Sequence, residues 1–272
     1  MNKFSFNRFK KVVVYDFHNT LSLYGFSMLI LMLIPVAIWT LGWVFHPLNE
    51  NFEVPPTMRL WVVYLMTTLA AALAPLKIYK SCNLRGTGNY FAMLPASLGE
   101  KFWSMFLYSF ILAPLAVFLG SAIVDTVLFV FPFGPFDSPI WDASLFGSRI
   151  DYSYYDGTTI PFFYGGYALL SCVLSVFSTA SVFFFTNTIF KKNKFIKTIL
   201  WSMLIGFVLT NILLPIFIHN APRFIEWISN HMYDLEPYRF FTNTYWVSIA
   251  FSALLTAIFS FFTFRRLKKM QY

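Results

Sequence analysis

Six long apolar runs, none of which contains Lys or Arg, divide this chain. They are 17 to 30 residues long and cover 21–45, 60–76, 102–130, 161–190, 198–218 and 245–264. A helix of ~20 residues crosses a bilayer core about 30 Å thick, and ~17 residues is near the lower limit. The runs are continuous rather than alternating, which favours helices over a β-barrel. They predict an all-α, polytopic membrane protein with six transmembrane helices.

Composition excludes a soluble domain. The chain is 58% hydrophobic and only 12% charged, whereas soluble domains carry about 25% charged residues. Its net charge of +8 does not indicate nucleic-acid binding, because the basic residues are sorted by the apolar runs. The two cysteines, Cys82 between runs and Cys172 within one, are not expected to form a disulfide.

The basic residues predict the orientation. Sixteen of the 20 lie in the N-terminus, the C-terminus and the loops that follow the second and fourth runs, while four lie in the other loops. Those four are Arg59, Arg149, Arg223 and Arg239. The positive-inside rule then places both termini in the cytoplasm. We expect a multi-pass protein of the plasma membrane, here a bacterial inner membrane, with loop 131–160 folded over its outer mouth.

Residues 1–20 predict an amphipathic helix at the membrane interface. Phe6, Phe9, Val13 and Phe17 fall on one helical stripe, and Arg8, Lys11, Tyr15 and Asn19 fall opposite. The helix is either an anchor to anionic lipid or a connecting element that also touches a cytoplasmic subunit. The chain therefore divides into this helix, 1–20, and a single six-span domain, 21–272.

The sequence carries no recognisable catalytic, cofactor or metal motif, so we predict no enzyme activity, no cofactor and no metal site. Three polar residues stand out within the runs, namely Asp125, Asn187 and Asn211. An ionisable residue inside a span is a candidate for function. Asp125 either serves transport or pairs with an arginine of an outer loop, such as Arg149 or Arg239.

The segment between the second and third runs has the features of a short, well-capped helix. Thr87 is a suitable N-cap, Tyr90, Phe91 and Leu94 would form an apolar side, and Pro95 ends the helix. Ser97 and Glu100 then have the spacing of a capping box at the start of the third span. The segment is either only a capped loop or a docking element for a cytoplasmic partner.

These residues resemble permease subunits of type-two ABC exporters. In that family a Gly-Thr, a short helix ending in Leu-x-x-Pro, a small polar residue and a Lys lie between spans two and three. Gly86-Thr87, Leu94, Pro95, Ser97 and Lys101 are similar. This chain has Asn83, Leu84 and Arg85 where the family often has acidic residues. The resemblance implies a cytoplasmic coupling helix that docks on an ATPase subunit through Arg85, Gly86, Thr87, Tyr90, Phe91, Leu94 and Pro95.

The resemblance implies the permease subunit of an exporter for an amphipathic or lipid-like substrate, with ATP hydrolysed only by a separate cytoplasmic ATPase subunit. The chain would contact membrane lipid and form a homodimer, or a heterodimer with a related permease, without nucleic acid. Two alternatives stay open. An ion-coupled secondary transporter would use Asp125 and Asn211, and a membrane scaffold or assembly factor would transport nothing.

The predicted topology is testable by labelling single cysteines in intact cells. In a chain without its native cysteines, Ser153→Cys should react with an impermeant thiol reagent, because it lies in a predicted outer loop. Ser97→Cys should not react, because it lies in a predicted cytoplasmic segment. The reverse pattern would rule out this orientation.

Overall fold

The structure is a computed structural model, and it describes residues 4–45, 54–80, 95–131, 134–136, 138–142, 149–153, 159–163, 165–205, 207, 211 and 237–270. Its principal helices are α1 (Phe6–Met32), α2 (Ile34–Phe45), α3 (Pro56–Ile78), α5 (Leu98–Phe106), α6 (Ala113–Val130), α7 (Gly165–Ile189) and α9 (Pro237–Met270). A π-helical turn, η3 (Leu107–Leu112), joins α5 to α6, and a 3-10 turn, η4 (Ile140–Asp142), follows later. Residues 194–205 are also helical.

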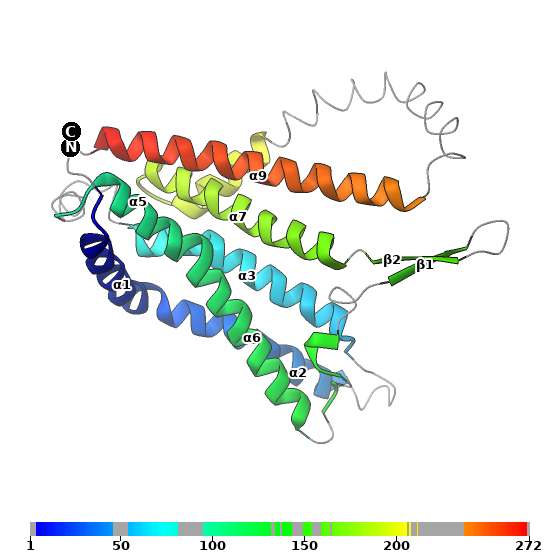
Figure 1. The fold of residues 1–272 in the computed structure, drawn as a ribbon. Coiled ribbons are helices and arrows are strands. Elements are labelled where there is room, and N and C mark those ends of the chain that lie inside the picture. The colour runs from blue at the N-terminus through cyan, green and yellow to red at the C-terminus, as the bar shows by residue number, and fades with distance from the viewer. Residues whose placement is uncertain are drawn as a thin grey trace.

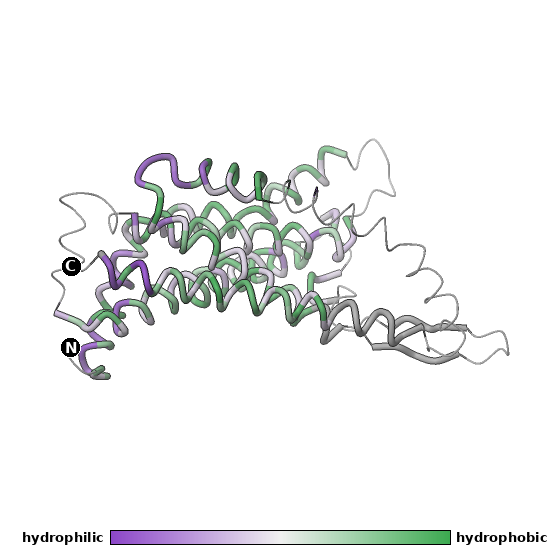
Figure 2. Tube along the Cα trace, turned by 90° about the horizontal axis from the view of Figure 1, so that it is seen from above, coloured by the Kyte–Doolittle hydropathy of each residue, from purple (hydrophilic) through white to green (hydrophobic). Residues whose placement is uncertain are grey.

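The helices form an elongated bundle (Figure 1). The start of α1 and the end of α9 lie at one end, which we call the terminal end, and a β-hairpin marks the opposite, hairpin end. Hydrophilic residues gather at the terminal end, while hydrophobic residues line the helices between the ends (Figure 2). Large apolar side chains face outward, including Phe26, Val130 and Val247, which are 77%, 72% and 70% exposed. Such a surface suits lipid rather than water.

Within the described residues, five helical stretches are long and apolar enough to cross a membrane: Phe6–Phe45, Pro56–Ile78, Leu98–Val130, Leu169–Ile189 and Trp246–Lys269. They fit a multi-pass membrane protein. The second, third and sixth predicted runs each lie within longer helices. Of the fifth run, residues 198–205 are helical and most of the remainder lies outside the described residues. The number of six spans therefore stays a prediction.

The N-terminal helix continues through the predicted boundary at residue 20. Helix α1 is interrupted only at Leu33, whose backbone N–H still bonds the carbonyl of Leu29 at 3.1 Å, before α2 begins. Pro35 explains the break, because it has no backbone N–H to bond the Leu31 carbonyl and its ring clashes with that carbonyl. The combined stretch of 40 residues would be about 60 Å long, twice the thickness of the bilayer core. One part of it must therefore lie outside that core.

A two-stranded β-hairpin is an addition to the otherwise helical fold that the sequence predicted. Strands β1 (Arg149–Ser153) and β2 (Thr159–Phe163) pair antiparallel, with Arg149 opposite Phe163. Residues 161–163, predicted as the start of the fourth span, belong to β2, and the helix begins only at Gly165. The signal was present in the sequence, because Asp156-Gly157 is a hairpin-turn dipeptide between two short runs that contain β-favouring residues.

Helix α3 is the centre of the bundle and packs against α1, α6 and α7. Small side chains allow this close approach: Ala70, Ala71 and Ala74 are fully buried. Toward the terminal end, aromatic rings fill the core. Phe106 stacks on Phe110 with ring centroids 4.2 Å apart, and Phe102 meets Phe264 edge-on at 5.3 Å.

A buried ion pair closes the hairpin end. Arg59 at the start of α3 donates from Nη1 to both carboxylate oxygens of Asp125 in α6, at 2.7 and 2.8 Å, and both side chains are at most 1% exposed. The Arg59 guanidinium also donates to the Ser138 carbonyl, and the Ile140 N–H donates to Asp125 at 3.1 Å. The pair therefore holds residues 138–140 across the ends of α3 and α6.

The ion pair corrects one detail of the sequence interpretation. Asp125 does pair with an arginine that the charge pattern had placed outside, but the partner is Arg59 rather than Arg149 or Arg239. Arg59 stacks over the Phe136 ring at 4.0 Å, which fixes its guanidinium from the other side.

We expect Asp125→Ala to destabilise the fold by about 3–5 kcal/mol, because it leaves the Arg59 charge buried and unpaired. The double variant Arg59→Met/Asp125→Leu removes both charges and should recover most of this loss. Thermal unfolding of the purified variants in detergent measures both effects. Equal Tm values for the single variant and the unmodified chain would contradict a structural role for the pair.

Candidate coupling site

The start of α5 is fixed by a complete capping box, as the sequence predicted. The Glu100 N–H donates to Ser97 Oγ at 3.3 Å, and the Ser97 N–H donates to Glu100 Oε2 at 2.7 Å. Ser97, the N-cap, has extended backbone geometry, with φ −67° and ψ 156°. The box satisfies backbone donors that the first turn of a helix leaves without partners.

The same carboxylate also holds the N-terminal helix. Glu100 Oε1 accepts a hydrogen bond from the Ser5 N–H at 2.6 Å and an ion pair from Arg8 Nη2 at 3.2 Å. Ser5 is the N-cap of α1, so one buried carboxylate lies at the N-termini of two helices, where the helix dipoles favour negative charge. Glu100 is fully buried, whereas Arg8 is partly exposed. The start of α1 is therefore docked on the start of α5.

A second carboxylate reinforces this contact from α1. Asp16 is 2% exposed, and its Oδ2 accepts hydrogen bonds from Ser104 Oγ in α5 at 2.6 Å and from the Tyr79 hydroxyl at 3.1 Å. Tyr79 is the residue that ends α3. The Tyr108 hydroxyl, in the π-helical turn, donates to the Val13 carbonyl at 2.7 Å. These bonds join α1 to both helices that flank residues 81–94.

The C-terminal end of α3 is capped by side chains from another part of the chain. Asn187 in α7 donates from Nδ2 to the carbonyls of Pro75 at 2.9 Å and Tyr79 at 3.3 Å. Lys194 Nζ donates to the Lys80 carbonyl at 3.0 Å and to Asn187 Oδ1 at 2.6 Å. Carbonyls in the last turn of a helix lack partners within it, and a cation there is favoured by the helix dipole.

Residues 81–94 thus connect two firmly anchored points. Before them, Lys80 is bound by Lys194. After them, Ser97 is bound by Glu100. A force on this segment would reach α7 through the first anchor and α1 through the second. The arrangement is suited to transmitting movement, and the described residues that form it include no assembled catalytic group.

The predicted site residues fall into three groups. Arg85, Gly86, Thr87, Tyr90, Phe91 and Leu94 lie outside the described residues, while Pro95 is described and exposed. Ser97 and Glu100 form the capping box. The two intramembrane candidates lie apart from this site: Asp125 is held by Arg59 at the hairpin end, and Asn211 is exposed and donates to the Phe207 carbonyl at 2.7 Å.

Sequence reasoning missed Asp16 and Lys194. The buried face of α1 includes Val12, Asp16, Thr20 and Tyr24, which recur every four residues. This periodicity was a usable signal. The apolar stripe on the other residues of the helix gave a different interpretation of which side is buried. Phe6 and Phe17 of that stripe are in fact 72% and 52% exposed. Lys194 was counted only as one of the basic residues that set the orientation.

Among the described residues, no group of three or more His, Cys, Asp or Glu side chains could hold a metal ion. Comparison of the chain with models of protein families, with curated proteins and with solved structures finds no match in any of the three. Function must therefore be argued from the site itself.

We expect Glu100→Ala to loosen the start of α1, because three donors, Ser5, Arg8 and Ser97, lose one shared acceptor. A hydrogen bond to a charged group contributes about 1.5–3 kcal/mol, so amide hydrogen exchange near Ser5 should accelerate ten-fold or more, that is about 1.4 kcal/mol. Glu100→Gln keeps a capping oxygen and should show a smaller effect. Unchanged exchange in the alanine variant would contradict the docking of α1 by Glu100.

Proposed function

We propose that this chain is the membrane permease subunit of an ABC-type exporter, which moves an amphipathic or lipid-like substrate with energy from a separate cytoplasmic ATPase subunit. One observation carries the proposal: both flanks of residues 81–94 are held by buried polar anchors, at Lys80 and at Ser97. Caps satisfy backbone groups at the ends of any helix, but these two also join the flanks of the segment to α1 and α7. The partner, a cytoplasmic ATPase subunit, is inferred from the resemblance of this segment to the coupling helix of type-two exporters.

The anchors suggest how movement would spread. Closure of the ATPase subunits would push on residues 81–94. Glu100 would pass the displacement to α1 through Ser5 and Arg8, and Asn187 with Lys194 would pass it to α7. In this proposal two copies of the chain, or one copy and a related permease, enclose the path. The terminal end faces the cytoplasm, as the distribution of basic residues indicates.

The continuous helical stretch Leu98–Val130 would transmit this movement along the bundle. It begins at the capping box and reaches Asp125, which is bound to Arg59 at the hairpin end. Displacement of Glu100 would therefore also move residues 138–140, which cross the ends of α3 and α6. Alternating access requires this kind of coupling between the two ends of a transporter.

Ion-coupled transport receives no specific support from the two intramembrane candidates. The Asp125 carboxylate already accepts bonds from Arg59 and Ile140, and the Asn211 amide donates to the Phe207 carbonyl. Transport driven by an ion gradient without an ATPase subunit would nevertheless favour this alternative. A scaffold role would be favoured if a bound ATPase moved no substrate.

The decisive experiment is co-purification of a tagged chain with its ATPase subunit. We expect Tyr90→Ala/Phe91→Ala to weaken that association about 30-fold, because truncating aromatic anchors commonly costs ~2 kcal/mol at an interface. Membrane insertion should be unchanged, since neither residue lies in a predicted span. The purified chain without the subunit is the baseline and should hydrolyse no ATP.

Trp103→Ala is the matched control, because Trp103 is also aromatic and is 54% exposed on α5, outside the segment. It should retain the subunit. If the double variant binds the subunit as well as the control does, residues 81–94 are only a capped loop.

A further inference from the structure

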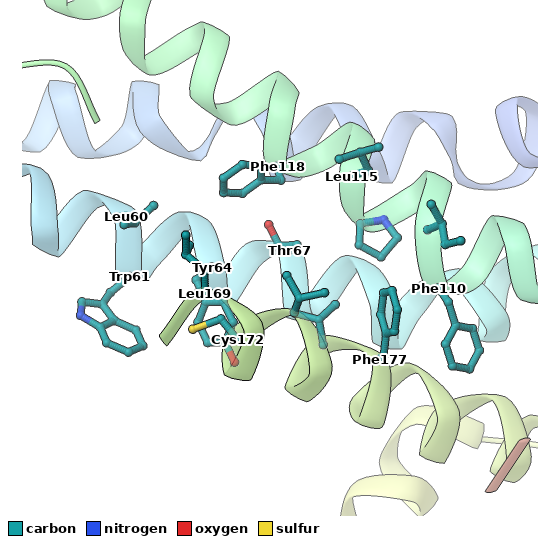
Figure 3. A pocket seen from close by; sticks show the side chains of 14 residues that line it. Leu60, Trp61, Tyr64, Thr67, Phe110, Leu115, Phe118, Leu169, Cys172 and Phe177 are labelled. Atoms are coloured by element: carbon teal, nitrogen blue, oxygen red, sulfur yellow. The ribbon is translucent and has the colours of Figure 1, made fainter. Parts of the chain in front are cut away.

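A cavity of about 350 Å³ opens between α3, α6 and α7. Side chains from all three helices face it, as Figure 3 shows. Its wall runs from Leu60 and Leu169, near the starts of α3 and α7, to Phe110 and Phe177 deeper in the bundle. The volume lies within the range of small-molecule sites, roughly 300–1,000 Å³. Neither the coupling site nor the ion pair explains this space.

Irregular backbone builds the deep end of the cavity. Phe110 and Ile111 belong to the π-helical turn η3, and Pro114 follows directly in α6; all three line the cavity. Pro114 lacks a backbone N–H, so α-helical pairing cannot continue through it, and the π turn accommodates the interruption. Such turns occur often at functional sites. The hollow is thus a consequence of local backbone geometry rather than of one missing side chain.

The segment held by the ion pair closes the hairpin end of the cavity. Ile140 is 1% exposed and packs in a cluster with Leu60, while the Trp141 ring meets Phe118 edge-on at 6.4 Å. Leu60 and Phe118 are wall residues. The remaining opening is lateral, because Trp61, Leu115 and Val173 are 50%, 48% and 49% exposed on the outside of the bundle. In a bilayer this opening faces lipid tails.

The wall offers no free hydroxyl group to a ligand. The Tyr64 hydroxyl is bonded to Ser175 Oγ, and Thr67 Oγ1 donates to the Val63 carbonyl at 2.8 Å. A polar ligand would lose its hydration here without replacement, at a cost of about 1–3 kcal/mol for each polar group. A helix, 10–12 Å across with its side chains, is too wide for a cavity of this volume. An unbranched hydrocarbon chain meets both conditions.

We propose that this cavity binds one acyl chain of a membrane lipid, which enters sideways between α3, α6 and α7. The Trp61 ring, at the hairpin end, belongs to a residue type that favours the level of lipid headgroups. The headgroup therefore stays near Trp61, and the chain's methyl end lies by Phe110 and Phe177. A role of this acyl-chain site in transport would rest on the proposed function. Binding of the acyl chain does not depend on it.

The test uses the full chain in phosphatidylethanolamine–phosphatidylglycerol vesicles that contain a phosphatidylethanolamine with a diazirine at one acyl terminus. After irradiation, we expect adducts to concentrate at Phe110 and Phe177. Val173→Trp fills the opening and should reduce these adducts several-fold. Val127→Trp is the matched control, since Val127 is 53% exposed on α6 and does not line the cavity; it should leave them unchanged.

A second measurement needs no filling variant. Cys172 lines the cavity, so in a Cys82→Ser background added lipid should slow its alkylation by N-ethylmaleimide in detergent several-fold. Adducts spread evenly over exposed residues such as Phe26, an unchanged alkylation rate, or an oxidative Cys172 cross-link between two copies would each overturn the proposal. These experiments contain no ATPase subunit or nucleotide, so a negative result would not contradict the proposed function. Conversely, failure of the chain to bind an ATPase subunit would not contradict the acyl-chain site.

Discussion

Three buried carboxylates hold the helices of this protein in place. Asp16, Glu100 and Asp125 are the acidic residues whose side chains the structure describes, and each is at most 2% exposed. Burying a charged group away from water is costly unless it is paired, so each must find partners within the protein. Each does so across elements distant in sequence: α1 with α5, and α3 with α6. The polar bonds therefore fix which helices are neighbours, while apolar packing alone would discriminate little among lipid-like surfaces.

These bonds are concentrated at the two ends of the bundle. Glu100 and Asp16 act at the terminal end, and Asp125 acts at the hairpin end. Between them, α3, α6 and α7 meet mainly through apolar side chains, with a hydrogen bond between Tyr64 and Ser175, and enclose the cavity. Directional bonds resist small displacements, whereas apolar contacts can slide and repack at lower cost. A bundle built this way can keep rigid ends and change shape in its middle, as the proposed transport cycle would require.

The sequence was most informative about local structure. Continuous apolar runs predicted long helices, and the three-residue spacing of Ser97 and Glu100 predicted a capping box, because both depend on neighbours along the chain. Partners distant in sequence were not predictable. Arg59 and Asp125 are 66 positions apart, and Asp16 lies 88 positions from Ser104; nothing local specifies either pairing. The β-hairpin was missed because apolar content outweighed its turn signal, so 161–163 were assigned to a span.

The π-helical turn η3 lies between the polar bonds at the two ends of the bundle. It lies in the only helical stretch of the described residues that connects the Glu100 anchor directly to the Asp125 pair. A straight helix would transmit an axial push without loss. The turn and Pro114 give this stretch a place where its backbone bonds are already irregular, so bending there disrupts fewer hydrogen bonds than elsewhere. Because Phe110 and Pro114 also form the cavity wall, bending at this position would change the shape of the cavity. Such bending would couple the shape of the apolar site to the position of the terminal end.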